Sequence, residues 1–96
     1  MSVIMIALAR PNPNNKDAAK QYSEGVQPIL KQYGGVPINR LSTLQAIVGD
    51  NIPSMTLLVK FESEEQLHAC FSSSDYLALV PLREKGFSSM DIYVCH

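Results

Sequence analysis

The first apolar run of this chain restricts its fold more than any other feature. Residues 3–9, VIMIALA, are all apolar and are followed by Arg10 and Pro11. A run of this length, rich in strand-forming residues and closed by a turn signal, predicts a buried strand and is too short to span a membrane. Because side chains alternate between the two faces of a strand, both faces of the predicted sheet carry apolar side chains. Both faces therefore need a cover.

The segment after this strand has the pattern of an amphipathic helix. Its apolar side chains recur at steps of three and four, at Ala18, Ala19, Tyr22, Val26, Ile29, Leu30 and Tyr33. We expect Asn14 or Asn15 to begin the helix as its N-cap and the two glycines at positions 34–35 to end it. Pro28 lacks a backbone donor, which predicts a bend near Gly25.

The rest of the chain also contains segments with helix patterns and segments with strand patterns. Ser63 and Gln66 have the spacing of a capping box, which predicts the start of a second helix. The expected extended segments are residues 36–41, 44–48, 55–61 and 90–95. The order strand, helix, strand, strand, helix, strand predicts an α+β fold, a ferredoxin-like βαββαβ arrangement with an antiparallel sheet, as a single domain over residues 1–96.

Helices cover only one face of such a sheet, so the second face raises the question of a partner. Strands with one face in water alternate apolar and polar side chains, but residues 3–8 and 55–59 are apolar on both faces. The resulting patch exceeds what monomers usually expose. We therefore expect a homodimer through the sheet faces, with a self-complementary twofold interface. Cover by chain ends or loops is the alternative.

Charge and composition argue against several other partners. The formal net charge is -1, from 8 basic and 9 acidic residues that do not cluster, which disfavours nucleic acid and anionic membranes. The apolar start lacks a basic region and a cleavage site, so a cytoplasmic protein is expected. Cys70 and Cys95 have no redox or metal-site spacing. Neither a disulfide, a metal site nor a cofactor is predicted.

Few residues carry a chemical signal. His68, in the second predicted helix, is the candidate general base, although a lone helical histidine is more often a surface residue. Arg40 stands among neutral residues of a strand, where its guanidinium suits a carboxylate or protects a sheet edge from aggregation. Tyr22 lies on the inner face of the first helix, where its hydroxyl can face a cavity and fix a polar ligand.

The stretch SSSDYLALVPLR, residues 72–83, predicts a short capped helix. Ser73 is its expected N-cap, and Asp75 suits the positive end of the helix dipole. Pro81 allows only a short or distorted helix before Arg83. Most of the stretch is therefore structural, and Arg83 alone is left as a ligand or interface contact.

Two segments, QPILKQYGG and SSDYLALVPLR, resemble the bacterial family catalogued as domain of unknown function 1330. The matching positions are Pro28, Leu30, Tyr33, Gly34, Gly35, Arg40, Phe71, Ser73, Asp75, Tyr76 and Arg83. That family is similar in fold to dimeric α/β barrel proteins, which include cofactor-free monooxygenases, muconolactone isomerases and stress-response dimers. Val48 and Lys60 stand where the family usually has glutamates. The resemblance implies the dimeric architecture and no settled activity.

Two functional hypotheses follow. In the first, a small cytoplasmic homodimer binds a polar or anionic organic molecule in the cleft between helices and sheet, through Arg40, Tyr22 and Arg83. Such a site can host cofactor-independent monooxygenase, isomerase or lyase-like chemistry, because a dry pocket with one or two polar groups can stabilise an enolate or carbanion. In the second, a non-catalytic binding or structural homodimer has a filled cleft. A cavity lined by Arg40 or His68 would favour the first.

Overall fold

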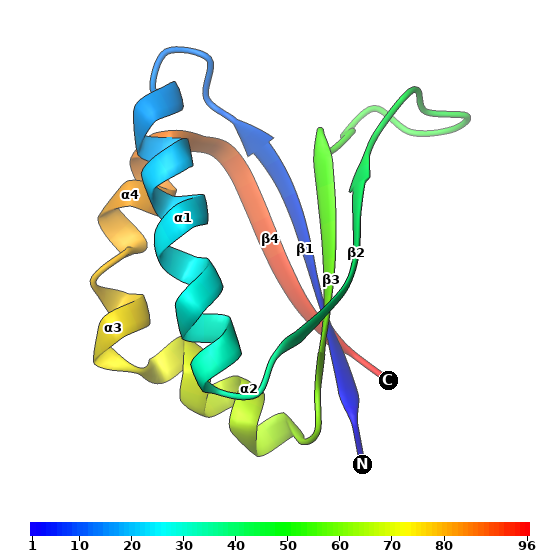
Figure 1. The fold of residues 1–96 in the computed structure, drawn as a ribbon. Coiled ribbons are helices and arrows are strands. Elements are labelled where there is room, and N and C mark those ends of the chain that lie inside the picture. Colours follow the sequence, from blue (N-terminus) through cyan, green and yellow to red (C-terminus); the bar gives the residue numbers. More distant parts are fainter.

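The computed structural model describes residues 1–96 and has a four-stranded antiparallel sheet with helices on one face (Figure 1). The elements in chain order are β1 (Val3–Pro11), α1 (Lys16–Gln32), β2 (Val36–Ser42), β3 (Met55–Phe61), α2 (Glu64–Ser72), α3 (Ser74–Leu77), α4 (Val80–Gly86) and β4 (Phe87–Cys95). The strand order in the sheet is β2-β3-β1-β4. This confirms the predicted α+β, ferredoxin-like arrangement. None of the helices has the length and apolar character that a membrane crossing requires.

The core lies between the helices and the inner face of the sheet. Phe61 and Val59 of β3 are completely buried, and Met5 of β1 lies opposite Val59 in the register. The predicted apolar stripe of α1 packs onto these strands. Six of its seven positions are buried, namely Ala18, Ala19, Tyr22, Val26, Ile29 and Leu30. The helical period of the sequence therefore identified the buried face of α1 correctly.

The end of α1 follows the prediction made from its two glycines. Gly34 has a φ of 87°, in the left-handed region that favours glycine. Its N–H donates to the carbonyl of Lys31, and the N–H of Gly35 donates to the carbonyl of Leu30. These two bonds form a Schellman motif, which satisfies carbonyl groups at the helix end. Pro28 lies inside α1, which nevertheless continues as one helix to Gln32.

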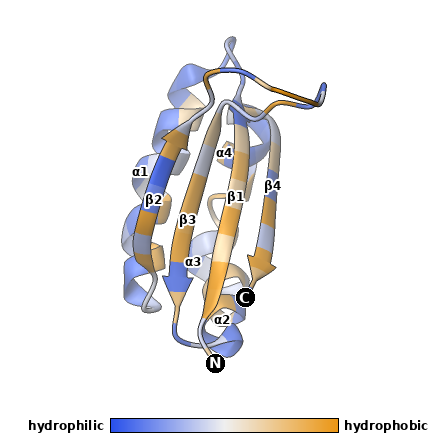
Figure 2. Cartoon of the chain, turned by 90° about the vertical axis from the view of Figure 1, so that its right-hand side faces the viewer, coloured by the Kyte–Doolittle hydropathy of each residue, from blue (hydrophilic) through white to orange (hydrophobic).

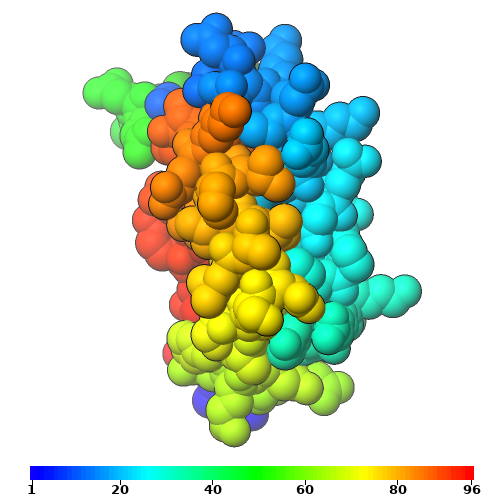
Figure 3. Space-filling view, turned by 90° about the vertical axis from the view of Figure 1, so that its left-hand side faces the viewer, coloured from blue at the N-terminus to red at the C-terminus, as the bar shows by residue number.

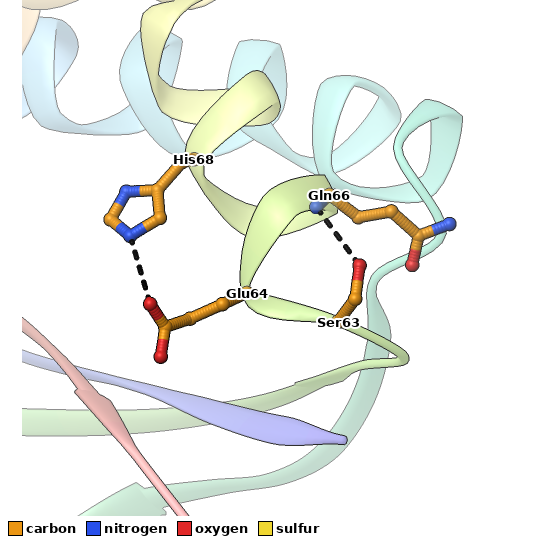
Figure 4. A network of polar contacts seen from close by, with 4 residues as sticks. All are labelled: Ser63, Glu64, Gln66 and His68. Carbon is orange, nitrogen blue, oxygen red and sulfur yellow. Dashed lines mark hydrogen bonds and ion pairs between the residues drawn. The ribbon is translucent and has the colours of Figure 1, made fainter. Parts of the chain in front are cut away.

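The two predicted serine caps are confirmed. Ser63 Oγ accepts a hydrogen bond from the backbone N–H of Gln66 at 3.1 Å, at the start of α2 (Figure 4). Ser73 Oγ accepts from the N–H of Tyr76 at 3.2 Å and donates to the carbonyl of Cys70 at 2.7 Å. The Ser73 side chain therefore begins α3 and also closes the end of α2.

Replacing Ser73 with alanine is expected to lower the free energy of unfolding by about 1 kcal/mol, because the cap of α3 is lost. Urea denaturation followed by circular dichroism measures the change. Ser74→Ala is the matched control, since Ser74 is exposed and makes no side-chain hydrogen bond. It should change stability by less than about 0.5 kcal/mol. Equal effects of the two substitutions would mean that the cap does not stabilise the fold.

Two predicted boundaries were wrong. Residues 44–48 are not a strand, because β2 ends at Ser42 and the segment beyond it has no strand to pair with. β4 begins at Phe87 and not at residue 90, since β1 continues to Pro11 and offers it a partner. The short helix predicted before Arg83 is α3, and Pro81 lies beyond it in the first turn of α4, where its missing N–H is not needed.

The N-terminal cap of α1 was predicted in position but not in mechanism. Asn15 is the N-cap residue, yet its side chain makes no cap hydrogen bond. The polar contact in this turn comes instead from the Asn12 side chain, which accepts from the N–H of Asn14 at 3.0 Å. The side-chain hydrogen bond therefore stabilises the turn before α1 and not the first turn of the helix itself.

The face of the sheet opposite the helices is apolar and uncovered in the single chain (Figure 2). On β1, the side chains between the buried ones point to this face, and Ile6 lies opposite Leu58 of β3 and Tyr93 of β4. We call this set the open face: Ile4, Ile6, Leu8, Leu58 and Tyr93. Tyr93 is 53% exposed, and the others are half-buried. These side chains keep exposed surface in the single chain, so chain ends and loops do not cover the open face completely.

The loop between β2 and β3, residues 43–54, projects on the side of the open face (Figure 1). Leu44, Ile47 and Val48 in this loop are between 85% and 98% exposed. The base of the loop is nevertheless fixed, because Arg10 Nε donates to the carbonyl of Ile52 at 2.6 Å. The chain thus displays apolar side chains on a projecting loop as well as on the open face.

Candidate functional site

An apolar cavity of about 70 Å³ lies between α1 and the inner face of the sheet. Its walls combine Met5 of β1, Leu57 of β3 and Ile92 of β4 with the aromatic rings of Phe71 and Phe87. Twelve of its fifteen lining residues are hydrophobic, so a water molecule inside it would find few hydrogen-bond partners. The space is too large for one water molecule and suits part of a small organic molecule.

Polar groups reach this cavity from α1 and from the edge strand β2. Ser23 and Gln27 lie one helical turn apart on α1, and Arg40 is the only charged residue in the lining. Arg40 lies opposite Leu57 in the register, which places its side chain on the helix side of the sheet. The cavity shares Gln27, Leu30, Arg40 and Leu57 with a wider groove between α1 and β2. Arg40 therefore stands where the cavity opens.

The guanidinium of Arg40 has no acidic partner. Its Nη2 lies 3.5 Å from the Sδ atom of Met55, a weak acceptor. The one contact in the chain between a basic and an acidic side chain joins His68 to Glu64 on α2. Arg40 is exposed, as an edge-strand charge that prevents aggregation would be. Its position in the cavity lining also leaves it free to bind an anion there.

A buried hydrogen-bonded chain begins at the cavity wall. Tyr22 Oη lies 2.9 Å from Tyr76 Oη, and Arg83 Nη1 donates to Tyr76 Oη at 3.0 Å. The ring of Tyr22 also meets Phe87 edge-on at a centroid distance of 5.5 Å. Burial, helped by the hydrogen bond to Tyr76, raises the pKa of Tyr22 well above its ordinary value. Tyr22 is therefore a neutral phenol at physiological pH.

Arg83 belongs to the same chain of hydrogen bonds. Its hydrogen bond to Tyr76 raises the pKa of the guanidinium, which is charged in any case. α4 carries Arg83, and Figure 3 shows α1 and the α3–α4 segment side by side in the helix layer. Arg83 does not line the cavity but reaches its wall through two tyrosine hydroxyls.

The predicted site residues thus fall into three places. Tyr22 and Arg40 line the same cavity, and Arg83 contacts it indirectly. His68 lies elsewhere, on the exposed side of α2, where its Nε2 is 3.7 Å from Glu64 Oε2 (Figure 4). Both of these side chains are 66% exposed. The candidate base is therefore not brought together with the candidate ligand contacts.

Sequence reasoning missed three contributors. Ser23 and Gln27 flank the apolar stripe of α1 at helical spacing, which was the available signal. Tyr76 was assigned to packing alone, although its hydroxyl joins Arg83 to Tyr22. No pattern in the sequence could have paired Tyr76 with Tyr22, because 54 residues separate them.

Comparison with known sequences identifies a family and no characterised relative. The model of the family described as "Domain of unknown function (DUF1330)" matches residues 5–96. No curated protein matches the chain. The family match covers all residues of the cavity wall and every element of the fold except the first two residues of β1.

Solved structures share the fold at low sequence identity. RPA0582, a protein of unknown function from Rhodopseudomonas palustris, is 14% identical over 97% of this chain and 79% of that one, with a TM-score of 0.84. A Nitrosomonas europaea protein named as a candidate antibiotic biosynthesis monooxygenase is 11% identical over 97% and 86%, with a TM-score of 0.69. A dimeric protein of unknown function and ferredoxin-like fold from Bacteroides fragilis is 12% identical over 97% and 93%, with a TM-score of 0.63. These likenesses establish the fold alone.

Proposed function

The chain belongs to the DUF1330 family, and on that premise we propose that it is a cytoplasmic homodimer that binds a small organic molecule between its helices and sheet. The bound molecule has an apolar body and a polar or anionic group. One observation carries this proposal: an apolar cavity opens beside a guanidinium that has no acidic partner. Binding sites for small molecules combine an apolar wall with a few placed polar groups in this way.

The polar contacts divide between the two ends of the cavity. Arg40 is exposed at its opening, where a guanidinium can hold a carboxylate through two parallel hydrogen bonds. Tyr22 is only 5% exposed and lies at the inner wall. The cavity itself argues against a structural dimer with a filled cleft, because packed side chains do not close the space.

Homodimer formation is supported by the open face and by the projecting loop. Both expose large apolar side chains that a second copy of the chain would cover through a twofold interface. The dimeric protein from Bacteroides fragilis, which has the same fold, favours this arrangement. The proposed interface lies on the opposite side of the sheet from the cavity, so binding and dimer formation use separate surfaces.

Cofactor-independent monooxygenase, isomerase or lyase-like chemistry on the bound molecule is the second candidate. The name of the Nitrosomonas europaea protein favours it, and a dry cavity with hydrogen-bond donors can stabilise an enolate or carbanion. The cavity wall, however, holds neither a carboxylate nor a histidine to remove a proton. Binding is therefore the function that the site supports best.

Benzoate tests the proposal, because it combines an aromatic body with a carboxylate. The wild type is expected to bind it in a ligand-observed NMR titration, and Arg40→Gln should weaken binding about tenfold, as for a hydrogen bond to a charged group. Lys20→Gln is the matched control, since Lys20 is an exposed cation of α1 outside the cavity. It should leave the affinity unchanged. Equal affinities of the wild type and Arg40→Gln would remove Arg40 from the site.

A further inference from the structure

The Arg83–Tyr76–Tyr22 chain gives the cavity a directed hydrogen-bond donor. We infer that Tyr22 presents its hydroxyl proton to the cavity, as the donor to a carbonyl oxygen or similar acceptor on the bound molecule, and that Tyr76 and Arg83 set this direction. The inference deepens the proposed function and rests on it. It assigns Tyr22 to ligand recognition and Arg83 to positioning.

The direction follows from what each group can donate. A guanidinium has five N–H donors and no acceptor, so Arg83 Nη1 must donate to Tyr76 Oη. The hydroxyl proton of Tyr76 therefore points away from Arg83. The only other group within hydrogen-bond distance of that hydroxyl is Tyr22 Oη, at 2.9 Å. Tyr76 accordingly donates to Tyr22.

The opposite direction is disfavoured by burial. If Tyr22 donated to Tyr76, the Tyr76 oxygen would accept two hydrogen bonds and its own proton would have no partner. Tyr76 is 2% exposed and does not line the cavity, so neither water nor ligand could accept that proton. Leaving a buried donor without an acceptor is costly. With Tyr76 donating, the one unpaired proton belongs to Tyr22, which is a residue of the cavity lining.

The hydrogen bonds in series from Arg83 through Tyr76 also strengthen the Tyr22 hydroxyl as a donor. The positive charge of Arg83 polarises the hydroxyl of Tyr76, and hydrogen bonds in series reinforce one another at low dielectric. The raised pKa of Tyr22 keeps its proton in place. An aromatic ring or alkyl group of the ligand would meet the apolar wall, while an oxygen acceptor would meet Tyr22. The inner end of the cavity therefore selects a ketone, aldehyde, ester or quinone type of oxygen.

Acetophenone and α-methylstyrene test the inference, because they have nearly the same shape and differ by a carbonyl oxygen in place of a methylene group. The readout is the ratio of their dissociation constants, α-methylstyrene over acetophenone, from ligand-observed NMR titrations. Tyr22→Phe should lower this ratio about fivefold, the range expected for one neutral hydrogen bond. The affinity for α-methylstyrene should stay unchanged, because the ring that packs on Phe87 is retained.

Two further substitutions test the positioning role. Arg83→Met keeps an unbranched side chain but removes the donor, which frees the Tyr76 proton and should lower the ratio about twofold. Arg83→Lys restores a donor and should restore the ratio. A merely structural role of Arg83 would weaken both probes equally and leave the ratio constant. Tyr76→Phe removes the donor to Tyr22 and serves as the second variant if Tyr22→Phe does not fold.

The outcomes separate this inference from the proposed function. An unchanged ratio in Tyr22→Phe overturns the inference while the cavity stands as a binding site. A ratio that is constant between the wild type and Arg83→Met overturns the positioning role. If the wild type binds none of the three compounds, acetophenone, α-methylstyrene and benzoate, the cavity is not a binding site and both proposals fail.

Discussion

Replacing Ile6 with aspartate is expected to convert the proposed homodimer into a folded monomer. Ile6 lies in the middle of the open face, opposite Leu58 on one side and Tyr93 on the other. In a face-to-face dimer its side chain would be buried against the partner, where a carboxylate without a counter-charge is strongly unfavourable. In the monomer the aspartate would point to water, so the fold should survive. Size-exclusion chromatography with light scattering gives the mass directly.

Leu77→Asp is the matched control for this experiment. Leu77 is 54% exposed, close to the exposure of Tyr93, but lies on α3 in the helix layer. The same apolar-to-acidic change there should leave the dimer intact. A dimeric Ile6→Asp variant would place the interface elsewhere, and a monomeric wild type would overturn the proposed dimer. Melting temperatures that rise with protein concentration would support the coupling of folding and association.

Replacing Gly86 with alanine is expected to lower the free energy of unfolding by about 3 kcal/mol, the upper end of the usual range for overpacking. Gly86 is the buried residue where α4 meets α1. A Cβ atom there would lie 2.7 Å from Ala19 Cα and 2.8 Å from the carbonyl carbon of Ala18. Both are backbone atoms of α1, which cannot turn aside as a side chain can. The two helices would have to separate, and core contacts would be lost.

Gly25→Ala provides the comparison. A Cβ at Gly25 would lie 3.0 Å from Leu79 Cδ2, which is the end of a flexible side chain. The contact can relax, and alanine favours the helix by up to about 1 kcal/mol over glycine. The net change should therefore be small. Urea denaturation of both variants measures the difference, and equal stabilities would mean that α4 can shift on α1 without loss.

Much of the candidate site depends on contacts that a linear pattern does not contain. Tyr22 and Arg40 were predicted as ligand contacts from their residue types and positions, and both line the cavity. His68 was proposed as a base on residue type alone, and the structure places it on the outer side of α2. The role of Tyr76 was missed because hydrogen bonding between distant side chains has no sequence period.

What the sequence by itself determined is local. The buried stripe of α1, the left-handed turn at Gly34, the caps at Ser63 and Ser73 and the span of β3 all depend on neighbours within a few residues. Periodicity, capping and backbone conformation act over that distance, so the pattern is enough to predict them.

Only the tertiary structure decided the features that need distant partners. β4 begins at Phe87 because β1 extends to meet it, and residues 44–48 stay outside the sheet because nothing pairs with them. Gly86 matters because α1 lies against it, and the cavity exists because the side chains of separate elements leave a space between them. Such features arise from packing between segments far apart in the chain, which no local pattern encodes.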